Sequence, residues 1–290
     1  MSEDQLVYLN GDYLPLPQAK VSVLDRGFLF GDGVYEVIPC YRGKPFRLQH
    51  HFARLAQSLL AIGLDNPHSQ AQWRVIMRRL LAQYPDQDRT LYLQITRGSS
   101  GRRELAIPED MVPTVFAMSS PLKQADPAVA SRGIAVVTLE DIRWQLCNIK
   151  TINILANQLL RQRARDMGCD EAILIRDGYA LEGSSSNLFI VQRGMLITPP
   201  PGPHLLPGVT RDLVLELAAA EGTARLEAAI PLAQLRQADE IWLTSSSREI
   251  MPVTRLDGEA VANGLPGPIY RQTANLYQAR KASWQAEASW

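Results

Sequence analysis

The stretch "NIKTINILANQLL", residues 148–160, decides how the rest of the chain is interpreted. Lys150 stands between an isoleucine and a largely apolar run, where the pattern predicts the start of a helix from about Thr151 to Met167. A cation at the positive end of a helix dipole, beside apolar side chains that remove its hydration, is driven toward its neutral form. A neutral amine attacks carbonyl carbons, so Lys150 is predicted to be a nucleophile that forms a Schiff base.

Composition and charge argue against several classes of function. The chain has 290 residues, 46% of them hydrophobic, which is enough for two domains with cores of their own. Thirty Lys and Arg balance thirty Asp and Glu. We therefore expect neither a nucleic acid nor a membrane surface as a partner, and a small-molecule substrate fits better.

The cysteines and the apolar runs indicate the compartment. Cys40, Cys147 and Cys169 are odd in number and lack the CxxC spacing, which predicts neither a disulfide framework nor a zinc or other metal site. The first residues lack the basic and apolar segments of a secretory leader, and no apolar run reaches about 18 residues. We expect a cytoplasmic chain that does not span a membrane.

Periodic patterns in the first 120 residues predict a sheet covered by helices. The predicted elements are a tight hairpin at Asn10-Gly11, helices over 48–62 and after Ser69, and strands over 90–98 and 112–120. Gly63 ends the first of these helices, and a second stripe along it carries the polar residues His51, Arg54 and Ser58. This part is predicted to be a small N-terminal α+β domain, residues 1–120.

Residues 121–132 combine proline, alanine and charged residues without a helical or strand period, and we predict an interdomain linker there. Residues 133–290 form the predicted larger C-terminal α+β domain, which carries Lys150. Its predicted elements are hairpins turning at Asp177-Gly178 and Arg193-Gly194, and a helix with Thr210 as N-cap, Asp212 in its first turn and Gly222 at its end.

A Schiff-base lysine that works with pyridoxal phosphate needs two further groups. One is a carboxylate that keeps the ring nitrogen protonated, and Glu182 in "LEGSSSN" offers it directly after a strand-like run. The other is a phosphate site, for which "LPGVTRD" places backbone N–H groups at a helix N-terminus. The hydroxyls of "TSSS", residues 244–247, and the charge of Arg54 complete the candidate set.

The joint pattern resembles the fold-type IV pyridoxal-phosphate enzymes from about residue 7 to 280. The segments that carry the resemblance, in order, are "DRGFLFGDGVYEV" (25–37), "HFARL" (51–55), "IKTINILANQL" (149–159), "EGSSSNLF" (182–189), "LPGVTR" (206–211) and "TSSSREIMPV" (244–253). The resemblance implies a two-domain α+β fold with the cofactor at the domain interface, and a homodimer.

The same resemblance implies roles for individual residues. Lys150 is the Schiff-base lysine and Glu182 the partner of the pyridine nitrogen. The implied cofactor-binding residues, besides these two, are Arg54, Ser185, Val209, Thr210, Ser245 and Ser246.

Within the family, "EGSSSNLF" and "IKTINILANQLLRQRA" look most like the D-amino-acid aminotransferases. This implies a ping-pong transfer of an amino group from a D-amino acid, or an R-amine, to a 2-oxo acid. A branched-chain L-amino-acid aminotransferase is the first alternative, and an aminodeoxychorismate lyase is the second. A non-catalytic cofactor carrier is a further alternative, from a different class.

The predicted substrate residues depart from the family pattern at one position. "ITRGSSGRRE" resembles the segment that grips the substrate carboxylate with an arginine and, two positions on, a histidine; Arg102 matches the arginine, but Glu104 replaces the histidine. An ionised glutamate repels a carboxylate. We therefore expect Glu104 to pair with Arg103 or Arg97, or the carboxylate trap to be rebuilt, with altered selectivity for D-amino acids. Tyr35 matches a pocket tyrosine that hydrogen-bonds the carboxylate.

Overall fold

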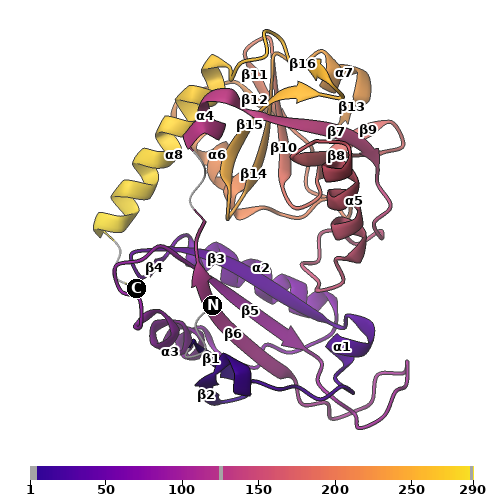
Figure 1. The fold of residues 1–290 in the computed structure, drawn as a ribbon, viewed down its shortest axis with the longest axis vertical. Coiled ribbons are helices and arrows are strands. Elements are labelled where there is room, and N and C mark those ends of the chain that lie inside the picture. Colours follow the sequence, from indigo (N-terminus) through magenta and orange to yellow (C-terminus); the bar gives the residue numbers. More distant parts are fainter. Residues whose placement is uncertain (1–4, 124–126, 288–289) are drawn as a thin grey trace. The chain divides into compact units, whose positions relative to one another are not determined.

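A computed structural model describes residues 5–123, 127–287 and 290, and it divides into two compact α+β units (Figure 1). Unit 1 comprises Met1–Leu122, Ile149–Asn153 and Gln285–Trp290, and unit 2 comprises Lys123–Asn148 and Ile154–Trp284. The segment that contains Lys150 thus packs with unit 1, whereas we expected it to belong to a domain spanning 133–290. The chain passes between the units more often than the linear boundaries suggested.

Unit 1 contains a six-stranded antiparallel sheet in the order β2-β1-β6-β5-β3-β4. Its strands are β1 (Leu6–Leu9), β2 (Asp12–Pro15), β3 (Gly33–Tyr41), β4 (Lys44–Pro45), β5 (Arg89–Thr96) and β6 (Thr114–Pro121). Asn10 and Gly11 join β1 to β2 with positive φ angles of 50° and 106°. The predicted hairpin is therefore confirmed.

Two helices, α2 (Leu48–Ala61) and α3 (Gln70–Leu81), pack on one face of this sheet. Leu55 and Trp73 from the helices share a buried core with Leu91 and Leu93 of β5. The alternation along β5 turns the side chains between these leucines to the other face of the sheet. Shorter helical turns, η1 (Leu16–Gln18) and α1 (Arg26–Phe30), precede β3.

Unit 2 is built on a larger mixed sheet in the order β12-β11-β10-β14-β15-β7-β8-β9-β13, and β9 also pairs with β10 so that the sheet closes on itself. Its strands are β7 (Ile134–Glu140), β8 (Glu171–Arg176), β9 (Tyr179–Gly183), β10 (Asn187–Gln192), β11 (Met195–Thr198), β12 (Arg225–Glu227), β13 (Ile230–Pro231), β14 (Glu240–Ser245), β15 (Glu249–Leu256) and β16 (Glu259–Ala260). Both predicted hairpins are confirmed, because the turn residues between β8 and β9 and between β10 and β11 have positive φ angles.

The helices of unit 2 correct three expectations. They are α4 (Pro127–Arg132), α5 (Leu155–Asp166), α6 (Val209–Ala220), α7 (Leu232–Arg236) and α8 (Pro268–Glu287). Part of the expected irregular linker is the helix α4. The helix after Lys150 begins only at Leu155, and the N-cap of α6 is Gly208 rather than Thr210. Among the described residues, no helix combines the length and apolar character needed to cross a bilayer.

Candidate active site

Backbone hydrogen bonds, rather than a helix end, fix the position of Lys150. The N–H of Tyr35 on β3 donates to the Lys150 carbonyl over 3.0 Å, and the N–H of Ile152 donates to the Gly33 carbonyl over 3.1 Å. The N–H of Lys150 itself donates to Ser58 Oγ on α2 over 3.1 Å. Because these bonds hold the segment extended against β3, the helix dipole invoked for Lys150 is absent at this residue.

Gly33 makes this close approach possible. A Cβ at this position would lie 2.6 Å from the Ile95 carbonyl oxygen and 3.1 Å from Cδ1 of Ile152. The glycine in "GDGVYEV" is thus required where the lysine segment meets β3.

The amine of Lys150 lies over an aromatic ring. Its Nζ is 4.1 Å from the centroid of the Tyr35 ring, a cation–π distance. The Tyr35 ring is 5.8 Å from that of Tyr92, whose hydroxyl donates to Gln94 Oε1 over 2.6 Å. The structure therefore brings together two predicted site residues, Lys150 and Tyr35.

Arg54 forms a buried cluster with two residues that we did not predict, Glu36 and His51. Its Nε and Nη2 lie 2.7 Å and 2.8 Å from the two oxygens of Glu36, and His51 Nδ1 lies 2.8 Å from the second oxygen. Burial raises the pKa of Glu36, but the Arg54 charge and the hydrogen bonds from Arg54 and His51 hold it well below its ordinary value. Burial also lowers the pKa of His51.

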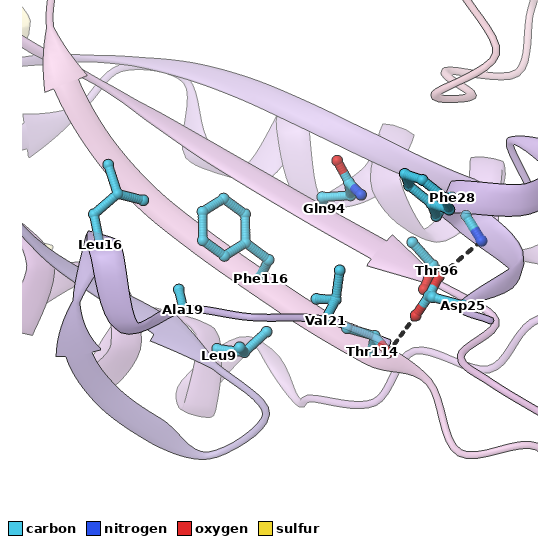
Figure 2. Close-up of a pocket in the computed structure, with 11 residues that line it drawn as sticks. Leu9, Leu16, Ala19, Val21, Asp25, Phe28, Gln94, Thr96, Thr114 and Phe116 are labelled. Atoms are coloured by element: carbon cyan, nitrogen blue, oxygen red, sulfur yellow. Dashed lines mark hydrogen bonds between the residues drawn. The ribbon is translucent and has the colours of Figure 1, made fainter. Parts of the chain in front are cut away.

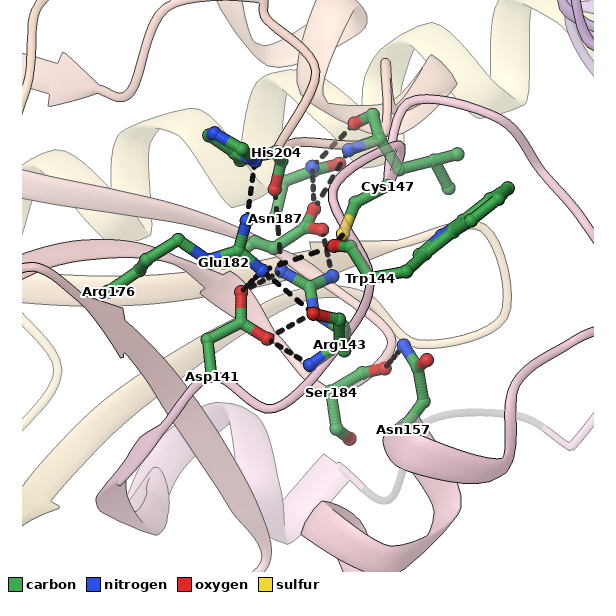
Figure 3. A network of polar contacts seen from close by, with 11 residues as sticks. Asp141, Arg143, Trp144, Cys147, Asn157, Arg176, Glu182, Ser184, Asn187 and His204 are labelled. Atoms are coloured by element: carbon green, nitrogen blue, oxygen red, sulfur yellow. Dashed lines mark hydrogen bonds and ion pairs between the residues drawn. The ribbon is translucent and has the colours of Figure 1, made fainter. Parts of the chain in front are cut away.

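Glu182 lies at the end of β9 in unit 2, with donors at both carboxylate oxygens (Figure 3). Arg143 Nη1 is 2.5 Å from Oε1. Asn187 Nδ2 and the N–H of Leu206 donate to Oε2 over 3.0 Å and 3.2 Å. Burial raises the pKa of Glu182 to about 7, against the opposing effects of Arg143 and the Leu206 amide.

Arg143 connects Glu182 to a second buried carboxylate. Its Nε and Nη2 donate to the two oxygens of Asp141 over 2.9 Å and 3.0 Å. Arg176 lies 2.9 Å from the same Asp141 and 2.5 Å from His204 Nδ1. Sequence reasoning missed this network, although Asp141 and Arg143 stand just before the lysine segment, residues 148–160.

In unit 2, two buried hydroxyls next in sequence to predicted phosphate residues lack a hydrogen-bond partner within the described part of the chain. Asn187 pairs in register with Glu182 on β9 and with Thr244 on β14, so the three residues form a row across three strands. Thr244 Oγ1 and Ser186 Oγ are buried, and neither has a hydrogen-bond partner within the described part of the chain. A buried hydroxyl without a partner costs about 1–3 kcal/mol. Such atoms fit a site whose ligand brings oxygen acceptors.

The N-terminus of α6 meets the same row. A Cβ at Gly208 would lie 1.8 Å from Asn187 Oδ1, so the start of this helix packs directly on Asn187. Its N-cap residue, Gly208, makes no side-chain cap hydrogen bond. The first-turn amides of Val209 and Thr210 therefore point out of the helix without a capping oxygen from its N-cap residue.

The serine residues of the two predicted loops are in different environments. Ser185 is exposed, whereas Ser245 and Ser246 are half-buried. The neighbouring Ser184 donates to the buried Glu171, which also binds Arg161 and Arg248. Glu171 thus holds the 183–186 turn and the 245–248 turn in fixed positions within unit 2.

The loop that carries Arg102 and Glu104 differs from the expected pairing. Glu104 pairs with Arg102 itself, with Nε 3.0 Å from Oε1, and the Arg102 side chain is 74% exposed. Arg97 instead binds Asp32 and two carbonyls at the end of α2, and Arg103 lies over the Phe30 ring. The expected pairing of Glu104 with Arg103 or Arg97 is therefore wrong.

A pocket of about 310 Å³ opens on the sheet face of unit 1 that α2 and α3 leave uncovered (Figure 2). It is lined by Leu9, Leu16, Ala19, Val21, Asp25, Gly27, Phe28, Gln94, Thr96, Thr114 and Phe116. None of these is a predicted site residue, but Gln94 is the cross-strand partner of Tyr35. Val21 and Phe28 at its edge are exposed apolar side chains.

Comparison with known proteins identifies the family. The model of the class IV aminotransferases matches residues 33–256. The chain belongs to the class IV aminotransferases. Enzymes of this class depend on pyridoxal phosphate, which is therefore the cofactor of this aminotransferase. The resemblance noted in the sequence is confirmed.

Relatives and solved structures are similar over almost the whole length of this aminotransferase. D-alanine aminotransferases of Bacillus licheniformis and of Listeria monocytogenes serotype 4b are 36% and 37% identical to it, covering 94% of the chain and 95% and 93% of the relatives. A branched-chain amino acid aminotransferase of Escherichia coli has a TM-score of 0.89 at 26% identity, over 95% of this chain and 94% of that one. The predicted fold-type IV architecture is thereby also confirmed.

Proposed function

We propose that this aminotransferase moves an amino group from a D-amino acid to a 2-oxo acid by a ping-pong mechanism. The observation that carries the substrate class is its 36% identity to a D-alanine aminotransferase over 94% of the chain. A branched-chain L-amino-acid aminotransferase is the alternative. Its support is weaker, because the identity to the branched-chain structure is 26%.

In this proposal the cofactor-binding residues are those that the family resemblance implies. Lys150 and Arg54 come from unit 1, and Glu182, Val209 and Thr210 come from unit 2. Arg54 and the first-turn amides of α6 hold the phosphate, together with the side chains of Ser185, Ser245 and Ser246. The unpartnered hydroxyls of Ser186 and Thr244 support a ligand beside the row formed by Glu182, Asn187 and Thr244.

When bound, pyridoxal phosphate supplies an electrophilic aldehyde and a ring that delocalises the electron pair left when a proton leaves the substrate α-carbon. Lys150 Nζ takes the α-proton of the amino donor, and in the second half-reaction it returns a proton to the α-carbon derived from the 2-oxo acid. The aromatic face of Tyr35, 4.1 Å from Nζ, keeps the amine in place between these steps. Glu182 holds the proton on the ring nitrogen.

The Lys150→Ala variant tests the catalytic assignment. It should lose turnover of D-alanine with 2-oxoglutarate while still retaining part of the cofactor, because the phosphate ligands remain. The exposed Lys20→Ala is the matched control and should behave as the wild type. Activity of Lys150→Ala at the wild-type level would refute the role of this amine.

The substrate class is tested by the colour of the purified protein. D-alanine should bleach the yellow form, whereas selective bleaching by L-leucine would establish the branched-chain alternative. Release of pyruvate from aminodeoxychorismate without an amino acceptor would establish a lyase. Colour that no amine or amino acid changes would indicate a non-catalytic cofactor carrier.

Glu104 gives a separate test of the substrate carboxylate site. Arg102 is already paired with Glu104, so a substrate carboxylate meets a compensated arginine and an acidic side chain. Replacing Glu104 with His should raise kcat/KM for D-alanine by about tenfold, roughly 1.4 kcal/mol. An R-amine without a carboxylate is the control and should change little. Equal effects on both substrates would contradict a role in carboxylate binding.

The assembly and compartment complete the proposal. We expect a homodimer, and the exposed Val21 and Phe28 beside the pocket of unit 1 support a face that another copy covers. Light scattering on the purified protein should give twice the 32.3 kDa chain mass. We place the enzyme in the cytoplasm, because its three cysteines are free thiols.

A further inference from the structure

We infer that Asp141 is a positioning residue that sets how strongly Glu182 holds a proton on the cofactor ring nitrogen, because Asp141 shares the charge of Arg143. This inference rests on the role proposed for Glu182. It adds a residue that does not itself touch the cofactor and acts through the arginine between the two carboxylates.

The geometry shows an arginine divided between two acids (Figure 3). One edge of the Arg143 guanidinium, Nε and Nη2, binds both oxygens of Asp141 over 2.9 Å and 3.0 Å. Only Nη1 is directed to Glu182, over 2.5 Å. All three side chains are at least nine-tenths buried, so water screens these charges little.

A second guanidinium balances the second acid. Arg176 Nη2 lies 2.9 Å from Asp141 Oδ2 and 3.2 Å from each of the carbonyl oxygens of Arg143 and Trp144, whereas its Nη1 binds Gln145 Oε1 and His204 Nδ1. The cluster therefore contains two carboxylates and two guanidiniums. Asp141 forms ion pairs with both arginines, whereas Glu182 forms an ion pair with a single nitrogen of Arg143.

The other titratable groups around the cluster are His204 and Cys147. His204 Nδ1 lies 2.5 Å from Arg176 Nη1, and Cys147 Sγ lies 3.2 Å from the Trp144 carbonyl oxygen. Neither has a hydrogen bond to Glu182, whose oxygens are bound by Arg143, Asn187 and Leu206. The charge on Glu182 is thus set mainly through Arg143.

Removing either charge next to Arg143 should act on Glu182 in opposite directions. Asp141→Asn leaves Arg143 with Glu182 as its one anionic partner, which makes Glu182 a weaker acceptor for the ring N–H. Arg176→Gln leaves Asp141 to compensate Arg143 more fully, which makes Glu182 a stronger acceptor. General damage to the fold would not produce effects of opposite sign.

The test uses holoenzyme reconstituted with pyridoxal phosphate labelled with ¹⁵N in the ring, and follows the ¹⁵N chemical shift against pH. The midpoint of this transition should fall by about one pH unit in Asp141→Asn and rise in Arg176→Gln. Glu182→Gln is the reference variant and should lower it further. Circular dichroism and cofactor content verify that each variant is folded and loaded.

The outcomes separate the inference from the proposed function. An unchanged midpoint in Asp141→Asn, together with a lowered one in Glu182→Gln, would overturn the role of Asp141 alone. An unchanged midpoint in Glu182→Gln would overturn the proposed role of Glu182 as well. If Asp141→Asn does not fold, a midpoint that falls in Arg176→Gln, or does not move, overturns the inference.

Discussion

Each unit of this aminotransferase contains a buried glutamate bound to a buried arginine, Glu36 with Arg54 in unit 1 and Glu182 with Arg143 in unit 2, and these two pairs behave differently. Glu36 in unit 1 accepts hydrogen bonds from two nitrogens of Arg54 and lies beside His51. The pKa of Glu36 is held well below its ordinary value. Glu182 in unit 2 receives one nitrogen of Arg143, and burial raises its pKa to about 7. Both side chains are almost wholly removed from solvent.

The difference shows that burial alone does not decide the charge of a carboxylate. Glu36 is fully compensated by its neighbours, so it is suited to orienting Arg54 and has little affinity left for another cation. Glu182 shares its arginine with Asp141 and is under-compensated. A carboxylate in that condition is suited to receiving one more positively charged donor, such as a protonated ring nitrogen.

The largest expected effect comes from removing the under-compensated charge. Glu182→Gln should lower kcat by roughly 1,000-fold, about 4 kcal/mol, because a neutral amide does not stabilise a protonated ring nitrogen. Steady-state kinetics with D-alanine measure the loss, and the exposed Glu259→Gln is the matched control. A wild-type kcat in Glu182→Gln would show that the charge of Glu182 is not needed for catalysis.

The compensated carboxylate should instead matter for stability. Glu36→Gln leaves the buried Arg54 without its anion and should lower the free energy of unfolding by about 3 kcal/mol, as measured in urea. Arg54→Met and the double variant complete a cycle. If Glu36 serves to compensate Arg54, the double variant should lose less than the sum of the single variants. Strict additivity would show that the pair does not act as a unit.

The two glutamates should also give the cofactor-free protein opposite pH dependences. The raised pKa of Glu182 contributes stability that is complete below about pH 4.5 and is lost as pH rises through about 7. The depressed pKa of Glu36 contributes stability above its ordinary value, which is lost as pH falls. Each slope is about 1.4 kcal/mol per pH unit within its window. When urea unfolding is measured against pH, Glu182→Gln should lose the slope between about pH 4.5 and 7, and Glu36→Gln should lose the slope at lower pH. A variant that keeps both slopes would contradict the pKa shift assigned to its glutamate.

The sequence predicted much of the fold, because its turns and helices carry local determinants. Asn10-Gly11 requires positive φ angles and forms the expected hairpin. Ser69 forms a capping box with Gln72 at the start of α3. The start of α5 was placed too early because residues 150–152 pair with β3, and this long-range contact leaves no trace in local periodicity.

The candidate site was predictable only where one residue carries the chemistry. Lys150 and Tyr35 were identified singly, and the structure brings them together. The partners of Arg54 were not identified, although its helical stripe with His51 and Ser58 pointed to a buried polar face. Asp141 and Arg143 were missed because a short polar segment before an apolar run is indistinguishable from an exposed loop until β9 places Glu182 beside it.

Because the lysine segment is extended against β3 at Gly33, the position of the Lys150 amine should tolerate substitutions but not insertions. Main-chain atoms hold Lys150, so exchanging the side chains around it should shift Nζ only slightly. A single-residue insertion between 149 and 153 is a different matter, because neighbouring residues in an extended chain point to opposite sides. Such an insertion would turn Lys150 Nζ away from Tyr35 while the main chain of the segment stays hydrogen-bonded to β3.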